Sequence, residues 1–129
     1  MWDDFAEYIL SEAGDEEVKI AEIAVGRFDK IADSLSVKEN VTLIKTDIAP
    51  KDETVIRDDI TNPDLDLYRD IDIIYSIRPP SELQPYIVKL ATEIGSQLII
   101  KPLTNEDLNT GKVKMKLKNF KKASFYTLR

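Results

Sequence analysis

Hydrophobic residues near the start of the chain recur at intervals of three and four. They are Trp2, Phe5, Ala6, Ile9, Leu10 and Ala13, and Gly14 follows them. This spacing places the apolar side chains on one face of a helix, and glycine is a common residue just after a helix end. The pattern predicts an amphipathic helix over residues 2–13.

Short apolar runs then alternate with further helical patterns. The runs predict strands at 18–25, 41–44 (running out at Thr46–Asp47), 54–56, 71–77 and 97–100. Helical spacing follows Gly26, at Phe28, Ile31, Ala32 and Leu35, and recurs from Leu83 to Ile94 before Gly95. Because strands and helices alternate, we expect βαβ units, which form an α/β, three-layer, Rossmann-like fold with a mainly parallel sheet.

Two readings remain for the start of the helix that ends at Ile94. Ser81 and Gln84 could form a capping box. Alternatively the helix begins at Pro85, because proline is tolerated in the first helical turn.

The end of the chain has a different pattern. Val113, Met115 and Leu117 alternate with lysines, which is typical of a strand buried on one face. Residues 124–128 could be its antiparallel partner. We therefore expect a C-terminal antiparallel hairpin at the edge of the sheet.

Composition narrows the chemistry. The 129 residues suit a single domain, 1–129, and they include no cysteine and no histidine. Disulfides, thiolate nucleophiles, the usual zinc ligands and imidazole catalysis are therefore excluded. No apolar run reaches the roughly 20 residues that span a bilayer, and the acidic start is unlike a signal peptide. We expect no membrane partner and a cytoplasmic location.

Charge is unevenly distributed. The net charge of −6 repels nucleic acid and anionic membranes, yet after Asp107 the charged residues are all basic: Lys112, Lys114, Lys116, Lys118, Lys121, Lys122 and Arg129. Lysines on an exposed edge strand prevent aggregation. A basic face could instead attract RNA or an anionic substrate, and the hairpin could pair with a second copy to form a homodimer.

Polar residues follow the expected strands where each one ends. They are Gly26–Arg27, Asp47, Asp58–Asp59, Ser76–Arg78 and Lys101. In open α/β sheets, ligands bind outside the carboxyl ends of the strands, near the point where strand order reverses. The sequence therefore predicts a ligand site at this edge of the sheet.

The spacing of Gly26 and Asp47 suggests a ligand class. An acid about 20 residues after the first turn accepts hydrogen bonds from ribose in dinucleotide-binding folds. Phe28 stands where a third glycine would allow a pyrophosphate to approach, so NAD and FAD do not fit. A nucleoside without a pyrophosphate, such as the adenosyl part of S-adenosylmethionine, does not need such a close approach to the backbone. The alternative is that Gly26 is only a tight turn and Asp47 a solvated strand end.

The remaining candidates also have two interpretations each. Asp58–Asp59 could receive an adenine amino group or hold a cation, or form a polar turn. Arg78, before Pro79, could bind a carboxylate or phosphate, or cap surface carbonyls. Glu22 lies inside the first strand, where a buried carboxylate needs hydrogen bonds. We expect it to accept backbone amides from the turn, and it could also shape a ligand pocket.

These segments carry a family resemblance. At Glu22–Phe28, Thr46–Asp47, Asp58–Asp59 and especially Tyr75–Pro85 (YSIRPPSELQP), the chain resembles uncharacterised protein family 0146 of the UPF series, small proteins of archaea. No activity follows from that family. More distantly, the layout resembles a class I S-adenosylmethionine-dependent methyltransferase.

The second resemblance implies roles for particular residues. Glu22 and Gly26 would border the methionine part of S-adenosylmethionine, with Asp47 at the ribose and Asp59 near the adenine. Arg27, next to Gly26, is a further candidate for cofactor binding. Ser76, Arg78 and Pro79 would lie where such enzymes hold the substrate. Ala24 and Phe28 replace the usual glycines, and Arg78 replaces a catalytic Asn or Asp. Two hypotheses remain open: a domain that binds S-adenosylmethionine or a related nucleoside, and a non-catalytic binding or assembly module.

Overall fold

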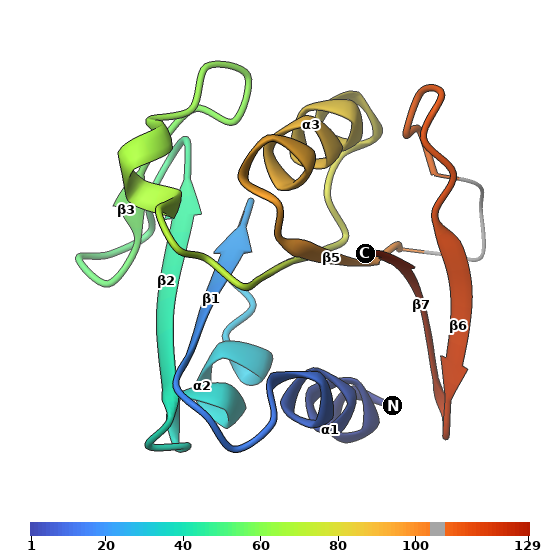
Figure 1. Cartoon of the computed structure of the whole chain (residues 1–129). Helices are drawn as coiled ribbons and strands as arrows, with labels where there is room; N and C mark the ends of the chain where they lie inside the picture. Colours follow the sequence, from blue (N-terminus) through green and yellow to red (C-terminus); the bar gives the residue numbers. More distant parts are fainter. Residues whose placement is uncertain (104–107) are drawn as a thin grey trace.

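The computed structural model describes residues 1–103 and 108–129, and Figure 1 shows the arrangement of their elements. The helices are α1 (Trp2–Ala13), α2 (Lys30–Ser36) and α3 (Gln84–Ile94), with 3-10 turns η1 (Leu65–Tyr68) and η2 (Ser81–Leu83). The strands are β1 (Val18–Ile23), β2 (Val41–Asp47), β3 (Ile56–Arg57), β4 (Ile73–Ile77), β5 (Gln97–Lys101), β6 (Lys116–Phe120) and β7 (Ala123–Leu128).

The strands form one sheet in the order β3-β2-β1-β4-β5-β7-β6. β3, β2, β1, β4 and β5 run parallel to one another, whereas β7 is antiparallel to both β5 and β6. The mainly parallel sheet and its C-terminal antiparallel hairpin confirm the fold class predicted from the sequence. The chain moves outward from β1 to β3 and then returns to β4, so strand order reverses between β1 and β4. A ligand crevice is expected at that reversal.

Helices cover both faces of the sheet. Figure 1 shows α3 on one face and α1 with α2 on the other. Side chains along a strand point alternately to the two faces, so each face has its own hydrophobic cluster. Ile20 and Tyr75 pack with α1 and α2, whereas Ala21 and Ile74 pack with α3. None of the helices in the described ranges is long and apolar enough to cross a membrane.

The strands β1 and β4 are each two residues shorter than the predicted 18–25 and 71–77, and two other strands differ more. The strand expected at 54–56 is reduced to Ile56–Arg57, and both residues are exposed. The strand expected from Val113 begins only at Lys116, and Leu117 is 58% exposed rather than buried. Val113 and Met115 instead pack, partly buried, against the cluster under α3. The alternation of these apolar residues with lysines therefore came from a partly buried irregular segment and not from a strand.

Two helix starts also differ. The first crossover helix begins at Lys30, so Phe28 precedes it. Helix α3 begins at Gln84 with Pro85 in its first turn, close to the second of the two readings. The capping box does not form, because the Gln84 side chain donates to the Pro79 carbonyl at 3.2 Å and accepts from the Asn109 amide at 2.6 Å. Residues 104–107, in the region where no helix was expected, lie outside the described residues.

Candidate functional site

A cavity of about 510 Å³ lies at the carboxyl ends of β1, β2 and β4. Its volume is within the usual range for small-molecule sites. The lining combines apolar side chains with a few polar groups: Ile23, Ala24, Val25, Gly26, Phe28, Thr46, Asp47, Ile48, Asp58, Asp59, Ile60, Ile77, Arg78, Pro80 and Leu83. Five residues chosen from the sequence therefore meet in one pocket, namely Gly26, Asp47, Asp58, Asp59 and Arg78.

Asp47 ties the turn after β1 to the end of β2. Its Oδ2 accepts a hydrogen bond from the Gly26 amide at 2.9 Å, and its Oδ1 accepts one from the Ala49 amide at 2.9 Å. Gly26 has a φ of 61°, in the left-handed region that glycine adopts without strain. Each carboxylate oxygen has a second lone pair. Asp47 can therefore hold the turn and still accept a hydrogen bond from a ligand hydroxyl.

Asp58 and Asp59 follow β3 and differ in what they contact. Asp59 Oδ1 accepts from the amide and hydroxyl of Thr61, at 2.9 and 2.7 Å, and these bonds lower the pKa of Asp59. Asp58 Oδ2 accepts from the Tyr68 hydroxyl at 2.7 Å, and its Oδ1 accepts from the Asp64 amide at 3.0 Å. The polar-turn interpretation therefore describes both residues. Asp59 Oδ2 has no hydrogen-bond partner among the described residues, so it can accept one from a ligand.

Arg78 is held at the rim of the pocket by two aromatic rings. Its Cζ lies 5.2 Å from the ring centroid of Trp2 and 5.9 Å from that of Phe28, and the two rings are 4.7 Å apart. Both separations are within the range of cation–π attraction. The Arg78 amide donates to the Lys101 carbonyl at 2.6 Å. Burial and the nearby Arg78 charge lower the pKa of the Lys101 ammonium.

Two residues without glycine's freedom have positive φ at the strand reversal. Ala24, after β1, has a φ of 57°, and Arg78, after β4, has a φ of 54°. This conformation costs an L-residue about 1–2 kcal/mol. Strained residues of this kind concentrate at ligand sites. Ala24 stands where the methyltransferase resemblance has a glycine, and its backbone has kept the glycine-like conformation.

Four residues chosen as cofactor-binding candidates do not line the cavity, namely Glu22, Arg27, Ser76 and Pro79. Ser76 is fully buried, and its hydroxyl donates to the Ile23 carbonyl at 2.6 Å, which joins β4 to β1. Pro79 is buried beside Arg78, and Arg27 is exposed. Glu22 lies on the face covered by α1 and α2, in register with Tyr75.

Glu22 was expected to accept backbone amides from the turn, but it accepts the Tyr75 hydroxyl at 2.7 Å instead. The Gly26 amide of the turn donates to Asp47, and the Glu22 carboxylate instead contacts Tyr75 on the adjacent strand β4. Burial raises the pKa of Glu22 to about 7, although the Tyr75 hydrogen bond and the Lys45 charge oppose this shift. Asp29 lies nearby and pairs with Lys51 and, at 3.9 Å, with Lys45.

Sequence reasoning missed the apolar walls and the aromatic rim. Trp2 was assigned only to the first helical stripe, and nothing in its spacing indicated a contact with Arg78. Tyr68 was not considered, yet its hydroxyl joins Asp58 to Thr46 behind the pocket, at 3.0 Å from Thr46 Oγ1. Among the described residues no group of three or more acidic side chains could hold a metal ion.

Several solved methyltransferases have folds similar to this chain. A magnesium protoporphyrin IX methyltransferase from Synechocystis PCC 6803, solved with bound SAM, has a TM-score of 0.59 at 10% identity and covers 98% of this chain and 75% of its own. An S-adenosylmethionine-dependent methyltransferase from Aquifex aeolicus has a TM-score of 0.56 at 14% identity, covering 95% and 87%. The fold is therefore that of the Rossmann-like methyltransferases.

Sequence comparison gives the family itself. The chain belongs to the Uncharacterised protein family (UPF0146), whose model matches residues 2–129. A UPF0146 protein of Methanothermobacter thermautotrophicus is 42% identical over 126 residues, covering 98% of this chain and 93% of the relative. One from Methanocaldococcus jannaschii is 44% identical over 117 residues, covering 84% and 81%. These archaeal relatives confirm the family that the sequence segments resemble.

Proposed function

We propose that the pocket at the strand reversal binds S-adenosylmethionine or a closely related nucleoside. The observation that carries this proposal is the convergence of Gly26, Asp47, Asp59 and Arg78 on one cavity of about 510 Å³. A likeness to methyltransferases in fold supports the choice of ligand class, because one of these neighbours was solved with bound SAM.

The side of the pocket formed by β2 and β3 suits an adenosine. Ile48 and Ile60 line it next to Asp47 and Asp59, so apolar surface and carboxylate acceptors occur together. A base stacks on apolar side chains while its amino group donates to an acceptor such as Asp59 Oδ2. Ribose hydroxyls would donate to Asp47, whose position is fixed by the Gly26 and Ala49 amides.

A dinucleotide fits this site poorly. Pyrophosphate binding uses a glycine-rich turn that opens a helix whose N-terminal amides face the phosphates. Here α2 has only seven residues, and its N-cap is Asp29, a carboxylate that would repel phosphate. The Phe28 side chain also lines the cavity. We therefore expect NAD and ATP to bind more weakly than S-adenosylmethionine.

The test is the thermal midpoint with and without ligand. At a hundred times its dissociation constant, S-adenosylmethionine or S-adenosylhomocysteine should stabilise the protein by about 2.7 kcal/mol, a rise on the order of 10 °C. NAD and ATP at the same concentration should produce a much smaller rise.

The chain offers a matched pair of variants for this test. Asp59→Asn keeps the oxygen that accepts from Thr61 but replaces Oδ2 with a donor, and it should weaken ligand binding about tenfold. Asp52→Asn is the control, because Asp52 accepts from the amide and hydroxyl of Thr54 in the same kind of turn, outside the pocket. It should leave the affinity unchanged.

The alternative is a non-catalytic binding or assembly module. Arg78 in place of a catalytic Asn or Asp is the feature that favours it. Thermal midpoints that do not respond to either adenosyl ligand would support this alternative. An equal response in Asp59→Asn and wild type would instead mean that the ligand binds without the Asp59 contact.

A further inference from the structure

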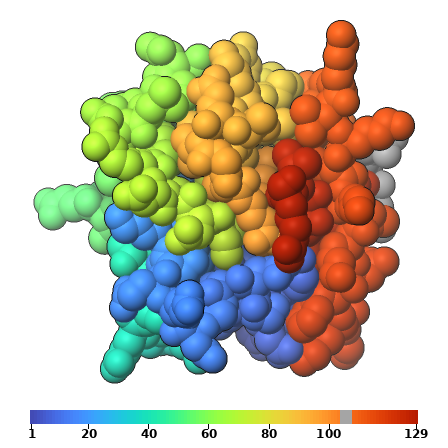
Figure 2. Space-filling model, in the orientation of Figure 1, coloured from blue at the N-terminus to red at the C-terminus, as the bar shows by residue number. Residues whose placement is uncertain are grey.

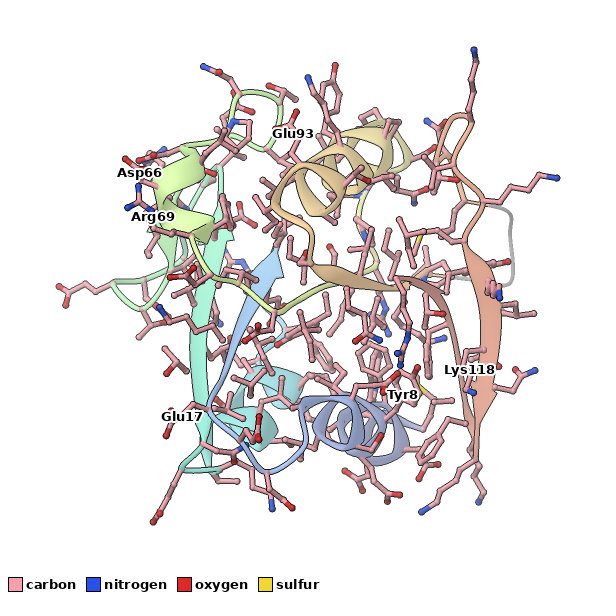
Figure 3. All side chains as sticks on the ribbon, viewed as in Figure 1. Tyr8, Glu17, Asp66, Arg69, Glu93 and Lys118 are labelled. Atoms are coloured by element: carbon pink, nitrogen blue, oxygen red, sulfur yellow. The ribbon has the colours of Figure 1, made fainter. Side chains whose placement is uncertain are left out.

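A second hollow lies far from the nucleoside pocket along the sheet, between α1 and the β6–β7 hairpin. Its cavity is about 800 Å³ and is lined by Tyr8, Ser11, Glu12, Lys114, Lys116, Leu117, Lys118, Phe120, Thr127, Leu128 and Arg129. We call it the basic groove. Figure 2 shows the hairpin, in orange and red, along one side of the molecule, beside the deep-blue α1. Figure 3 shows that Tyr8 comes from α1 and Lys118 from β6.

The cations of the hairpin differ in whether an acid already neutralises them. Lys121 Nζ lies 2.6 Å from Glu7 Oε2, and Arg129 pairs with Glu12. Lys114, Lys116 and Lys118 form no salt bridge within residues 1–103 and 108–129, and all three line the basic groove. Their charge is therefore available to a partner.

Lys116 and Lys118 are regularly spaced on β6, and Lys114 lies just before this strand. Lys116 faces Thr127 and Lys118 faces Phe125 across the ladder, so both point to the α1 side of the sheet. Alternate residues of a strand are about 7 Å apart. A row of evenly spaced cations is complementary to a chain of evenly spaced anions.

A second copy of the protein is a poor partner for this surface. β6 is the last strand of the sheet, so its outer edge could pair with another β6. Such pairing would bring two lysine rows together, and like charges on adjacent strands are destabilising. Preventing aggregation accounts for lysines on an exposed edge strand, but it does not account for their position around a groove that also has an aromatic side chain.

We propose that the basic groove binds single-stranded nucleic acid through its phosphates. Proteins that bind single strands combine a positively charged groove with aromatic side chains, and Phe120 supplies an aromatic ring here. A duplex is read by an element that enters its groove, whereas this surface is concave. The acidic remainder of the molecule opposes binding weakly, because charges beyond about 8–10 Å are screened at physiological salt.

The proposal is tested with a labelled single-stranded RNA of about 12 nucleotides, by fluorescence anisotropy from about 50 to 200 mM NaCl. Three phosphate contacts predict a slope of log affinity against log salt of about −2. The variant Lys116→Gln/Lys118→Gln should reduce that slope by about 1.4 and weaken binding about tenfold at low salt. The control Lys19→Gln/Lys38→Gln removes two exposed lysines outside the groove, so it changes net charge equally and should leave binding within about twofold.

Three outcomes would overturn the proposal. The first is that wild type fails to bind the RNA at low salt, and the second is that both double variants lose the same affinity. The third is that a glutamate-rich peptide of the same charge binds as tightly as the RNA. The last result would assign the groove to an acidic protein partner. Because the groove variants do not touch the nucleoside pocket, failure here leaves the thermal response to S-adenosylmethionine intact.

Discussion

At the scale of single residues, Glu22 shows how burial alters an ordinary carboxyl group. Its folded pKa of about 7 is above the usual 4.5, with burial as the main cause. Between these values the native state keeps the proton and the unfolded chain releases it. The free energy of unfolding therefore falls as pH rises from about 4.5 to 7, by about 3 kcal/mol in all.

The variant Glu22→Gln should remove most of this pH dependence. Glutamine can still accept the Tyr75 hydroxyl, and it has no charge to bury. We expect wild type and variant to have similar stability near pH 4.5, and the variant to be about 2–3 kcal/mol more stable near pH 8. Urea unfolding at the two pH values measures this. Glu17→Gln, at an exposed side chain (Figure 3), should follow wild type, and parallel curves for all three proteins would contradict the prediction.

Residues at the strand ends were the predictable part of the candidate site. Gly26, Asp47, Asp59 and Arg78 could be chosen because parallel strands bring their carboxyl ends to one edge. The left-handed conformation of Ala24 could not be foreseen, because alanine does not signal it. The side from which Glu22 finds its hydrogen bond depends on register with β4, which a single sequence does not give.

At the scale of elements, the strands that are buried were the ones that the sequence predicted well. β1, β4 and β5 are buried on both faces, so each leaves an apolar run in the sequence. β3 has two exposed residues, and the apolar run at 54–56 that predicted it overlaps the strand only at Ile56. In β6 four of the five residues are exposed, so its hydrophobic pattern could not mark its bounds. Strands defined only by backbone pairing are therefore the ones that sequence patterns misplace.

Asp47 joins the turn after β1 to the end of β2, and the pocket depends on this link. Removing the carboxylate should lower the free energy of unfolding by a measurable amount. Asp47→Ala leaves the amides of Gly26 and Ala49 without their carboxylate acceptor, although water can replace it in part. We expect a loss of about 1–2 kcal/mol in urea unfolding, with Asp47→Asn intermediate.

The control for this prediction lies on η1. Asp66→Ala removes an exposed carboxylate that is 2.7 Å from Arg69, a pair visible in Figure 3. Exposed pairs contribute little, so we expect a change within about 0.5 kcal/mol. If Asp47→Ala and Asp66→Ala lower the free energy of unfolding equally, the hydrogen bonds of Asp47 between β1 and β2 do not stabilise the fold.

At the scale of the whole molecule, two possible binding regions lie at different parts of one sheet. The pocket proposed to bind a nucleoside is at the reversal between β1 and β4, and the basic groove is beside the last strand, β6. The strand order that separates them could not be read from the sequence, because it depends on which strand each crossover reaches. Helix α1 contributes to both regions, with Trp2 at one end and Glu12 near the other.

Trp2 is the single tryptophan of the chain, and its ring lies against Arg78 at the rim of the pocket. The intrinsic fluorescence of the protein under selective indole excitation therefore comes from one fluorophore at the candidate site. A ligand whose carboxylate draws the guanidinium off the ring should change the emission intensity, so an unlabelled titration reports occupancy directly. Adenosine lacks that carboxylate and should change the emission much less. Emission that stays constant while calorimetry shows saturation by S-adenosylmethionine would mean that Arg78 does not move on binding.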